Sequence, residues 1–268
     1  IARGKNLVVV GDPNQMPPTN FFVSNKEDED NLELEDLESI LDDCLALPLP
    51  SRHLQCHYRS KHESLIAFSN AKFYENRLLT FPSPDARQSK VTLQHITGTY
   101  DRGKSRTNVA EAEAVVAAVI AHLADPVKRK RSLGIVTFSV PQQNIVEDLL
   151  AAAFARHPDL ETLDAQSAEP IFIKNLENVQ GDERDVIFFS VGYGADATGY
   201  VGHNFGPLNQ KGGWRRLNVA ITRARYEMVI YSTLRYDQID LKRTQAEGAI
   251  ALRAFLEFAE KGHGCLLY

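Results

Sequence analysis

The sequence predicts a doubly wound α/β domain, with a mostly parallel sheet covered by helices on both faces. Short, nearly continuous apolar runs recur along the 268 residues, and segments with helical spacing lie between many of them. This alternation is typical of parallel strands, which are buried on both faces by the helices that connect them. Hydrophobic residues make up 43% of the chain and charged residues 24%, which excludes fibrous, collagenous and wholly disordered proteins.

The individual elements follow from local sequence patterns. Apolar runs bounded by turn residues predict strands, and apolar residues that repeat at steps of three and four predict helices. The predicted strands are residues 7–10, 54–58, 91–96, 133–138, 171–174, 186–191 and 228–232. The predicted helices are residues 111–123, 142–155, 214–224 and 248–259.

The net charge of −5 conceals an uneven distribution of charged side chains. Residues 27–43 hold ten acidic and no basic side chains, so the rest of the chain carries about five more bases than acids. A mildly basic body suits a phosphate backbone without proving that one binds. In the acidic stretch, Leu34, Leu37, Leu41 and Leu45 predict an amphipathic helix with a solvated acidic face. A role of this stretch as an intramolecular decoy for nucleic acid stays an alternative.

Cysteine usage and hydropathy bear on the cellular setting. The three cysteines are odd in number and widely spaced, which suits a reducing cytoplasm. No apolar run approaches the ~18–20 residues that cross a bilayer. We therefore expect a cytoplasmic protein without a membrane partner.

One segment with phosphate chemistry follows the first predicted strand. Residues 11–18 read Gly-Asp-Pro-Asn-Gln-Met-Pro-Pro, and ligands of doubly wound sheets lie beyond the carboxyl ends of strands. The amide of Gln15 can hydrogen-bond a phosphate or a water without adding charge. A plain Pro-rich turn is the alternative for this segment.

Three further segments carry basic or glycine-containing patterns beside strands. Residues 214–225 predict a helix on which Arg216 and Arg223 project together, away from the apolar face. A rigid guanidinium fork suits the charge that spreads over the oxygens of a γ-phosphate. Residues 58–62 contain Tyr-Arg, and residues 175–185 contain a glycine that permits close backbone approach to a phosphate or sugar. Solvated surface arginines are the alternative, but the ordered set of segments favours phosphate chemistry.

On these segments the chain resembles the second RecA-like motor domain of a superfamily 1 DNA or RNA helicase. The similarity is to the branch of the RNA-surveillance helicases, including large bacterial multidomain relatives, and it covers nearly the whole chain. Residues 11–18 resemble motif III, 58–62 the Tyr-Arg element that follows it, 133–142 motif IV, 175–185 motif V and 215–225 motif VI.

The resemblance implies a division of the chain into three parts. Residues 1–20 would end a first motor domain, residues 21–50 would form an acidic linker helix, and residues 51–268 would form the second RecA-like domain. We therefore expect the chain to be a piece of a longer protein, with the rest of that helicase chain as its partner.

The resemblance also implies an ATP site in the cleft between two motor domains. Arg59 and Arg223 would act as paired arginine fingers converging on one rim, and Gln15 would sense the γ-phosphate. The implied nucleotide-binding residues are Gly181, Glu183 and Arg216. ATP and Mg²⁺ would be bound mainly by the first motor domain, so we expect this chain alone not to hydrolyse ATP.

A strand of single-stranded DNA or RNA is the other implied ligand. The residues that match strand-contacting positions are Thr137, Gln142 and Asn175, whose contacts would be to phosphate and sugar rather than to base edges. Two functions remain open: an ATP-driven helicase or translocase, and a catalytically silent RecA-like scaffold that binds nucleic acid or protein. The combined presence of Gln15 and both arginines favours the motor, because a scaffold needs none of them.

Residues 98–105 imitate a different nucleotide-binding motif. They read Gly-Thr-Tyr-Asp-Arg-Gly-Lys-Ser and satisfy the phosphate-loop pattern G-x-x-x-x-G-K-[ST]. In a true phosphate loop the helix begins at the Gly-Lys-Ser, so that its first amides hold the phosphates. Here Asn108 and Glu111 predict a helix start about three residues later. We therefore expect a basic turn.

Overall fold

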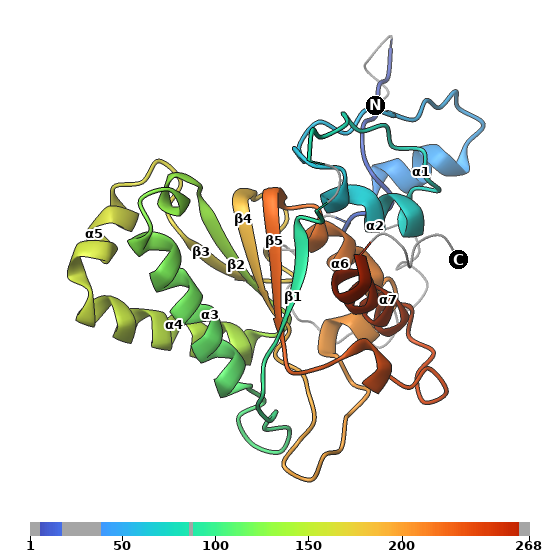
Figure 1. Ribbon diagram of the computed structural model, residues 1–268. Helices are drawn as coiled ribbons and strands as arrows, with labels where there is room; N and C mark the ends of the chain where they lie inside the picture. Colours follow the sequence, from blue (N-terminus) through green and yellow to red (C-terminus); the bar gives the residue numbers. More distant parts are fainter. Residues whose placement is uncertain (1–5, 18–38, 86–87, 263–268) are drawn as a thin grey trace, which may run out of the picture.

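The fold is built on one five-stranded sheet in which all strand pairs are parallel (Figure 1). The computed structural model describes residues 6–17, 39–85 and 88–262. The strands are β1 (Val91–His95), β2 (Leu133–Thr137), β3 (Phe172–Asn175), β4 (Arg184–Ser190) and β5 (Ala224–Ser232), and their order in the sheet is β1-β5-β4-β2-β3. The predicted α/β class with a parallel sheet is confirmed.

Helices cover both faces of the sheet and enclose a separate hydrophobic core on each (Figure 1). One face carries α3 (Val109–Ala124), α4 (Val140–Arg156) and α5 (Pro158–Ala165). The other face carries α2 (Ser64–Phe73), α6 (Gly213–Ile221) and α7 (Glu247–Lys261). The remaining elements are α1 (Ile40–Ala46) and three short 3₁₀ turns, η1 (Lys128–Lys130), η2 (Gly206–Asn209) and η3 (Tyr236–Gln238).

Side-chain caps fix the start of the two long helices beside β2. Asn108 caps α3 by accepting from the Glu111 amide, and Ser139 caps α4 by accepting from the Gln142 amide. Pro141 lies in the first turn of α4, where its missing N–H costs nothing. The predicted α3 cap is therefore confirmed.

Two predicted strands are absent from the described chain. Residues 7–10 pair with no strand of the described chain, with Val8 85% and Val10 79% exposed, and residues 54–58 form only an isolated bridge between Cys56 and Leu79. A strand requires a neighbour for its backbone hydrogen bonds, and an apolar run alone does not supply one. The helix predicted for 214–224 ends at Ile221, because β5 already begins at Ala224.

Two helices were missed, and the acidic stretch is only partly described. Both α2 and α5 lack a clear apolar stripe in the sequence, and α2 buries Ser64 and Ser69 among its apolar residues. Of the predicted linker helix, residues 21–38 lie outside the described residues, and the described part is α1, capped by Ser39. None of the helices in the described ranges has the length and apolar character needed to span a bilayer.

Candidate functional site

Two arginines that are far apart in the chain meet at Thr222, at the N-terminal ends of β4 and β5. Arg59 donates from Nη1 to the Thr222 carbonyl oxygen at 3.3 Å, and Arg223 donates from Nη2 to the Thr222 hydroxyl at 3.0 Å. Arg59 also forms an ion pair with Glu183, the residue before β4, with Nε 2.5 Å from Oε2. We call Arg59, Glu183, Thr222 and Arg223 the arginine rim.

Arg223 is the more buried of the two arginines. It is 3% exposed, and its Nε donates to the Val219 carbonyl at 2.7 Å, within the last turn of α6. Burial, assisted by the positive charge of Arg59, lowers the pKa of Arg223 to about 10. Arg59 and Arg223 are neighbouring cations, and Arg223 is shielded from water. An anionic ligand between them would therefore reduce their electrostatic repulsion.

The loop that carries Arg59 is held by a neutral histidine. His57 accepts from the backbone N–H of Ser60 at Nε2, and the Lys61 N–H donates to the Arg225 carbonyl at 2.8 Å. Burial, together with the charge of Arg59, lowers the pKa of His57 to about 4. The ring therefore stays neutral at pH 7 and keeps its acceptor for the loop backbone.

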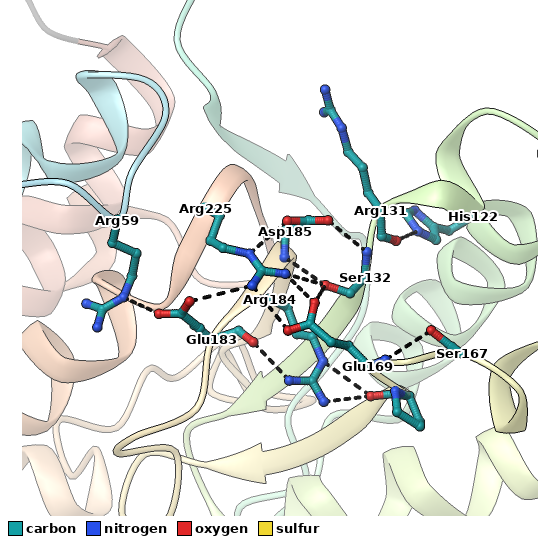
Figure 2. Close-up of polar contacts among 11 residues, drawn as sticks. Arg59, His122, Arg131, Ser132, Ser167, Glu169, Glu183, Arg184, Asp185 and Arg225 are labelled. Carbon is teal, nitrogen blue, oxygen red and sulfur yellow. Dashed lines mark hydrogen bonds and ion pairs between the residues drawn. The ribbon is translucent and has the colours of Figure 1, made fainter. Parts of the chain in front are cut away.

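Figure 2 shows that Glu183 lies between two arginines and belongs to a longer chain of ion pairs. Its second oxygen lies 3.5 Å from Nη1 of Arg225. Arg225 in turn donates from Nε to Asp185 at 2.8 Å and from Nη2 to Ser132 at 3.0 Å, and it forms a further ion pair with Glu169. Hydrogen bonding from Arg59 is the main cause that lowers the pKa of Glu183. The position of Arg59 thus depends on a network anchored by Arg225.

A local change of register helps to place Arg225. Arg184 pairs with Ala224 and Val186 pairs with Glu227, so β5 contributes one more residue than β4 to this stretch. Such a bulge bends the strand and redirects side chains. Arg225 lies in the irregular stretch and contacts Asp185, the residue of β4 between the two pairs.

The segment with Gln15 packs against the same face through a polar network. Gln15 Nε2 donates to Asp12 at 2.9 Å, and the Tyr74 hydroxyl donates to the same carboxylate at 2.7 Å. Asn218 of α6 donates to the Asn14 carbonyl at 2.7 Å and to the Tyr74 oxygen at 3.0 Å. Asn218 is followed in α6 by Val219, whose carbonyl accepts from Arg223, and this places the network beside the arginine rim.

The remaining predicted nucleotide-binding residues lie on the segment that leads into β4 and on α6. Gly181 has a φ of +92°, a conformation that favours glycine, and the space around its Cα is open. The backbone there is accessible to a ligand. Arg216 forms an ion pair with Glu177, with Nε 3.4 Å from Oε1. This contact directs Arg216 toward Glu177, whereas Arg223 contacts Thr222.

The three predicted strand-contacting residues lie at the opposite, C-terminal edge of the sheet. Thr137 and Gln142 are fully buried, and Gln142 bonds the backbone N–H and carbonyl of Asn108 and the hydroxyl of Ser190. Asn175 is 7% exposed and donates to Gln143 at 2.8 Å. Asn175 lines a surface cavity of about 620 Å³, whereas the side chains of Thr137 and Gln142 are held inside the protein.

The imitation phosphate loop is closed on itself. The Asp101 carboxylate accepts from the backbone N–H groups of Lys104 and Ser105, at 3.2 and 3.1 Å, and from the Ser105 hydroxyl. These are the kinds of donor that a phosphate would need, and α3 begins only at Val109. The late helix start expected from the sequence is confirmed.

Comparison with known proteins gives the family. Residues 37–234, well over half of the chain, match the family described as AAA domain. The chain belongs to this family. Its relatives include the "Uncharacterized ATP-dependent helicase MG140" of Mycoplasma genitalium, 34% identical over 96% of this chain and 24% of that protein. Two more are the "5'-3' DNA helicase ZGRF1" of Mus musculus, 25% identical over 86% of this chain and 11% of that protein, and the "Helicase sen1" of Schizosaccharomyces pombe, 28% identical over 86% and 13%.

These relatives confirm the predicted resemblance to a helicase motor domain, and the parallel sheet with helices on both faces agrees with the predicted α/β class. This AAA domain spans about a quarter of the length of the first relative, so the helicase names describe proteins that are much longer than this chain.

Sequence reasoning missed several residues that the AAA domain uses to build these sites. Asp12, Tyr74 and Asn218 form the polar network beside the arginine rim, and Arg225 anchors Glu183. Arg225 lies two residues after Arg223 in the same arginine-rich segment, so its type was visible. Its role was not, because its acidic partners come from distant segments.

Proposed function

We propose that this AAA domain is the second motor domain of an ATP-dependent helicase or translocase of single-stranded nucleic acid. In this proposal Arg59 and Arg223 face the γ-phosphate of an ATP that is bound, with Mg²⁺, mainly by a first motor domain of the same protein. The observation that carries the proposal is the convergence of the two arginines on Thr222, beside the segment that contains Gln15.

Both arginines suit an anionic ligand for separate reasons. Arg59 is about a quarter exposed and is held by Glu183, so its remaining donors face a surface that solvent reaches. Arg223 is buried beside it, and its lowered pKa records the electrostatic cost of that position. A γ-phosphate placed between them would offset the repulsion of like charges, and a fork-shaped guanidinium can donate two hydrogen bonds to it.

Stepping along a strand would follow from closure of the cleft between the two motor domains. ATP supplies a phosphate that both domains contact, and its hydrolysis removes the contacts of Arg59 and Arg223. The arginines thereby couple the chemical step to opening of the cleft. DNA and RNA are both candidates for the strand, because phosphate contacts are common to the two and only a contact to the sugar 2′-hydroxyl distinguishes them.

The test is the strand-stimulated ATPase rate of the full-length protein with Arg223→Ala and Arg223→Lys. An arginine finger contributes roughly 10³ to 10⁵ in turnover, so both variants should lose at least about 10³-fold, with nucleotide affinity changed far less. Arg235→Ala, which removes a surface guanidinium paired with Glu260, is the matched control and should keep the wild-type rate. Retention of a tenth of the rate by a folded Arg223→Ala protein would reject the finger role and favour the silent scaffold.

A further inference from the structure

A surface cavity lies at the C-terminal edge of the sheet. Its volume of about 620 Å³ lies in the range of small-molecule sites. It is on the opposite edge of β4 from the arginine rim, because Tyr193 and Gly194 follow β4 whereas Glu183 precedes it. The cavity is therefore separate from the arginine rim, although Glu177, the partner of Arg216, is among its lining residues.

Two of the loops that line the cavity are tied to each other. The Tyr100 N–H donates to the Ala195 carbonyl at 2.9 Å, and Arg102 forms an ion pair with Asp196 at 3.4 Å. The first of these loops contains the imitation phosphate loop, whose turn is fixed by Asp101.

The side chains of the cavity combine aromatic surfaces with positive charge. Tyr100, Tyr193 and Tyr200 line it, together with Arg102 and Arg106. Tyr100 and Tyr193 pack edge to face with ring centroids 5.7 Å apart, and Tyr193 is almost fully buried, so this wall is rigid. Asn175 lines the same cavity and connects it to the segment predicted to contact a strand.

Tyr200 and Arg102 form an exposed stacking platform. The Arg102 guanidinium carbon lies 4.5 Å from the centroid of the Tyr200 ring, and Arg243 lies at 5.1 Å and donates to the Tyr200 hydroxyl at 2.7 Å. Tyr200 is 39% exposed and the Arg102 side chain 50% exposed. Planar guanidinium groups and aromatic rings are the surfaces on which unstacked bases pack, and neither needs a particular base.

We propose that this cavity holds one unstacked nucleotide of the bound single strand, with its base against the Tyr200–Arg102 platform and its phosphate near Arg106. The inference rests on the proposed function and deepens it. It assigns contacts with the strand to residues 100–106 and 193–207, with Asn175 at one wall of the cavity. Gln142 lies behind this surface and supports it through its hydrogen bond with Asn108.

The experiment measures binding of short thymidine and uridine strands to the full-length protein by fluorescence anisotropy. Each strand carries a single abasic position, and that position is moved along the strand. Wild-type protein should show one position at which loss of the base weakens binding several-fold more than elsewhere. Tyr200→Ala should weaken the intact strand roughly 5- to 150-fold, the range given by loss of a base–aromatic stack, and should erase the position-specific penalty.

The chain offers a matched control for this variant. Tyr226 is 38% exposed and also lies under a guanidinium, that of Arg131 at 4.8 Å, but it is on β5 away from the cavity. Tyr226→Ala should keep both the affinity and the penalty. Tyr200→Phe should also keep them, because it preserves the ring. If Tyr200→Ala fails to fold, Arg102→Ala, whose side chain is half exposed, replaces it with the same expectation.

The outcomes separate this inference from the function on which it rests. Equal penalties at every abasic position, or a penalty that survives in folded Tyr200→Ala protein, would overturn the cavity assignment while leaving strand-stimulated ATP hydrolysis in place. Competition by free thymidine or uridine monophosphate at micromolar concentration would also overturn it, in favour of a site for a small effector. Absence of any strand-stimulated hydrolysis in the wild type would instead reject the proposed function.

Discussion

Replacing Arg225 with methionine removes the guanidinium that Glu169, Glu183 and Asp185 share. Arg225 contacts all three carboxylates and the Ser132 hydroxyl, and its own side chain is 21% exposed. Methionine keeps much of the aliphatic stem, so the change removes mainly the charge and its hydrogen bonds. Glu169 and Asp185 then lose the guanidinium that they share, whereas Glu183 keeps its ion pair with Arg59.

The loss of unfolding free energy caused by Arg225→Met lies between the values for exposed and for buried ion pairs. Exposed ion pairs contribute about 0.2–1 kcal/mol, and breaking a buried pair costs about 3–5 kcal/mol. Asp185 is 18% exposed, whereas Glu169 and Glu183 are 38% exposed, so solvent screens part of the effect. We expect the free energy of unfolding of Arg225→Met to be about 2 kcal/mol lower than that of the wild type at pH 7.

The deficit should depend on pH. Hydrogen bonding from Arg225 lowers the pKa of Glu169 below its ordinary value of 4.5, so the stability that Glu169 gains from the pair is present above that pH. It is lost as pH falls below 4.5 through the lowered folded-state pKa, because the unfolded state takes up the proton first. The difference between the wild type and Arg225→Met should therefore narrow from pH 5 downward.

Urea unfolding of the chain, followed by the fluorescence of its single tryptophan, measures this difference. Trp214 stacks on Phe73 with ring centroids 5.0 Å apart, so its emission reports on packing of α6 against α2. Arg131→Met, which removes an exposed guanidinium from above Tyr226, is the control and should cost less than about 1 kcal/mol. A deficit of the same size at pH 7 and pH 4, or no coupling to Glu169→Gln in a double-mutant cycle, would refute the reasoning.

Two further predictions concern the loop regions before α3. Asn108→Ala removes the α3 cap and the 2.6 Å hydrogen bond to the Thr233 hydroxyl, so the free energy of unfolding should fall by about 2 kcal/mol. Asn108→Ser keeps a cap acceptor and should recover about half of that loss. Equal stability of the two variants in urea would contradict the cap assignment. Lys104→Ala should leave nucleotide affinity and the hydrolysis rate of the full-length protein within about twofold of the wild type, because the loop N–H groups already donate to the Asp101 carboxylate. If calorimetry showed that this variant loses micromolar ATP binding, residues 98–105 would be a true phosphate loop.

The sequence predicted the sheet well wherever a strand is buried on both faces. The cores of β2, β4 and β5 are continuous apolar runs, and every residue of β2 is buried. Residues 7–10 have the same local pattern but no strand beside them in the described chain. Local sequence encodes the tendency to extend, whereas pairing depends on what lies next to the strand in space.

The candidate sites divide in a similar way. The sequence identified Arg59 and Arg223 as candidate phosphate-binding residues, because both lie in recognisable motifs. The structure brings both side chains to Thr222. Burial was not visible for Gln142, an amide that the fold uses to join α4 to the start of α3. The cavity was also hidden, because its aromatic and basic residues come from two loops that only the folded sheet brings together.

The segment between β3 and β4 joins the two proposed sites. β3 and β4 are parallel strands on either side of β2, so their connection must cross from the C-terminal edge of the sheet back to the N-terminal edge. Here the crossing starts at Asn175, which lines the cavity, and ends at Glu183, which holds Arg59. It is anchored to the core at Leu176 and Val179, which are fully buried, and the Leu176 N–H donates to the Thr137 carbonyl, whereas residues 177, 178, 180 and 181 are exposed. A short segment that is anchored in the core and has one end at each site is a physical connection of the kind that can carry energetic coupling. In a motor this is the pair of sites that must be coupled, since removal of a phosphate contact at Arg59 has to change the grip on the strand.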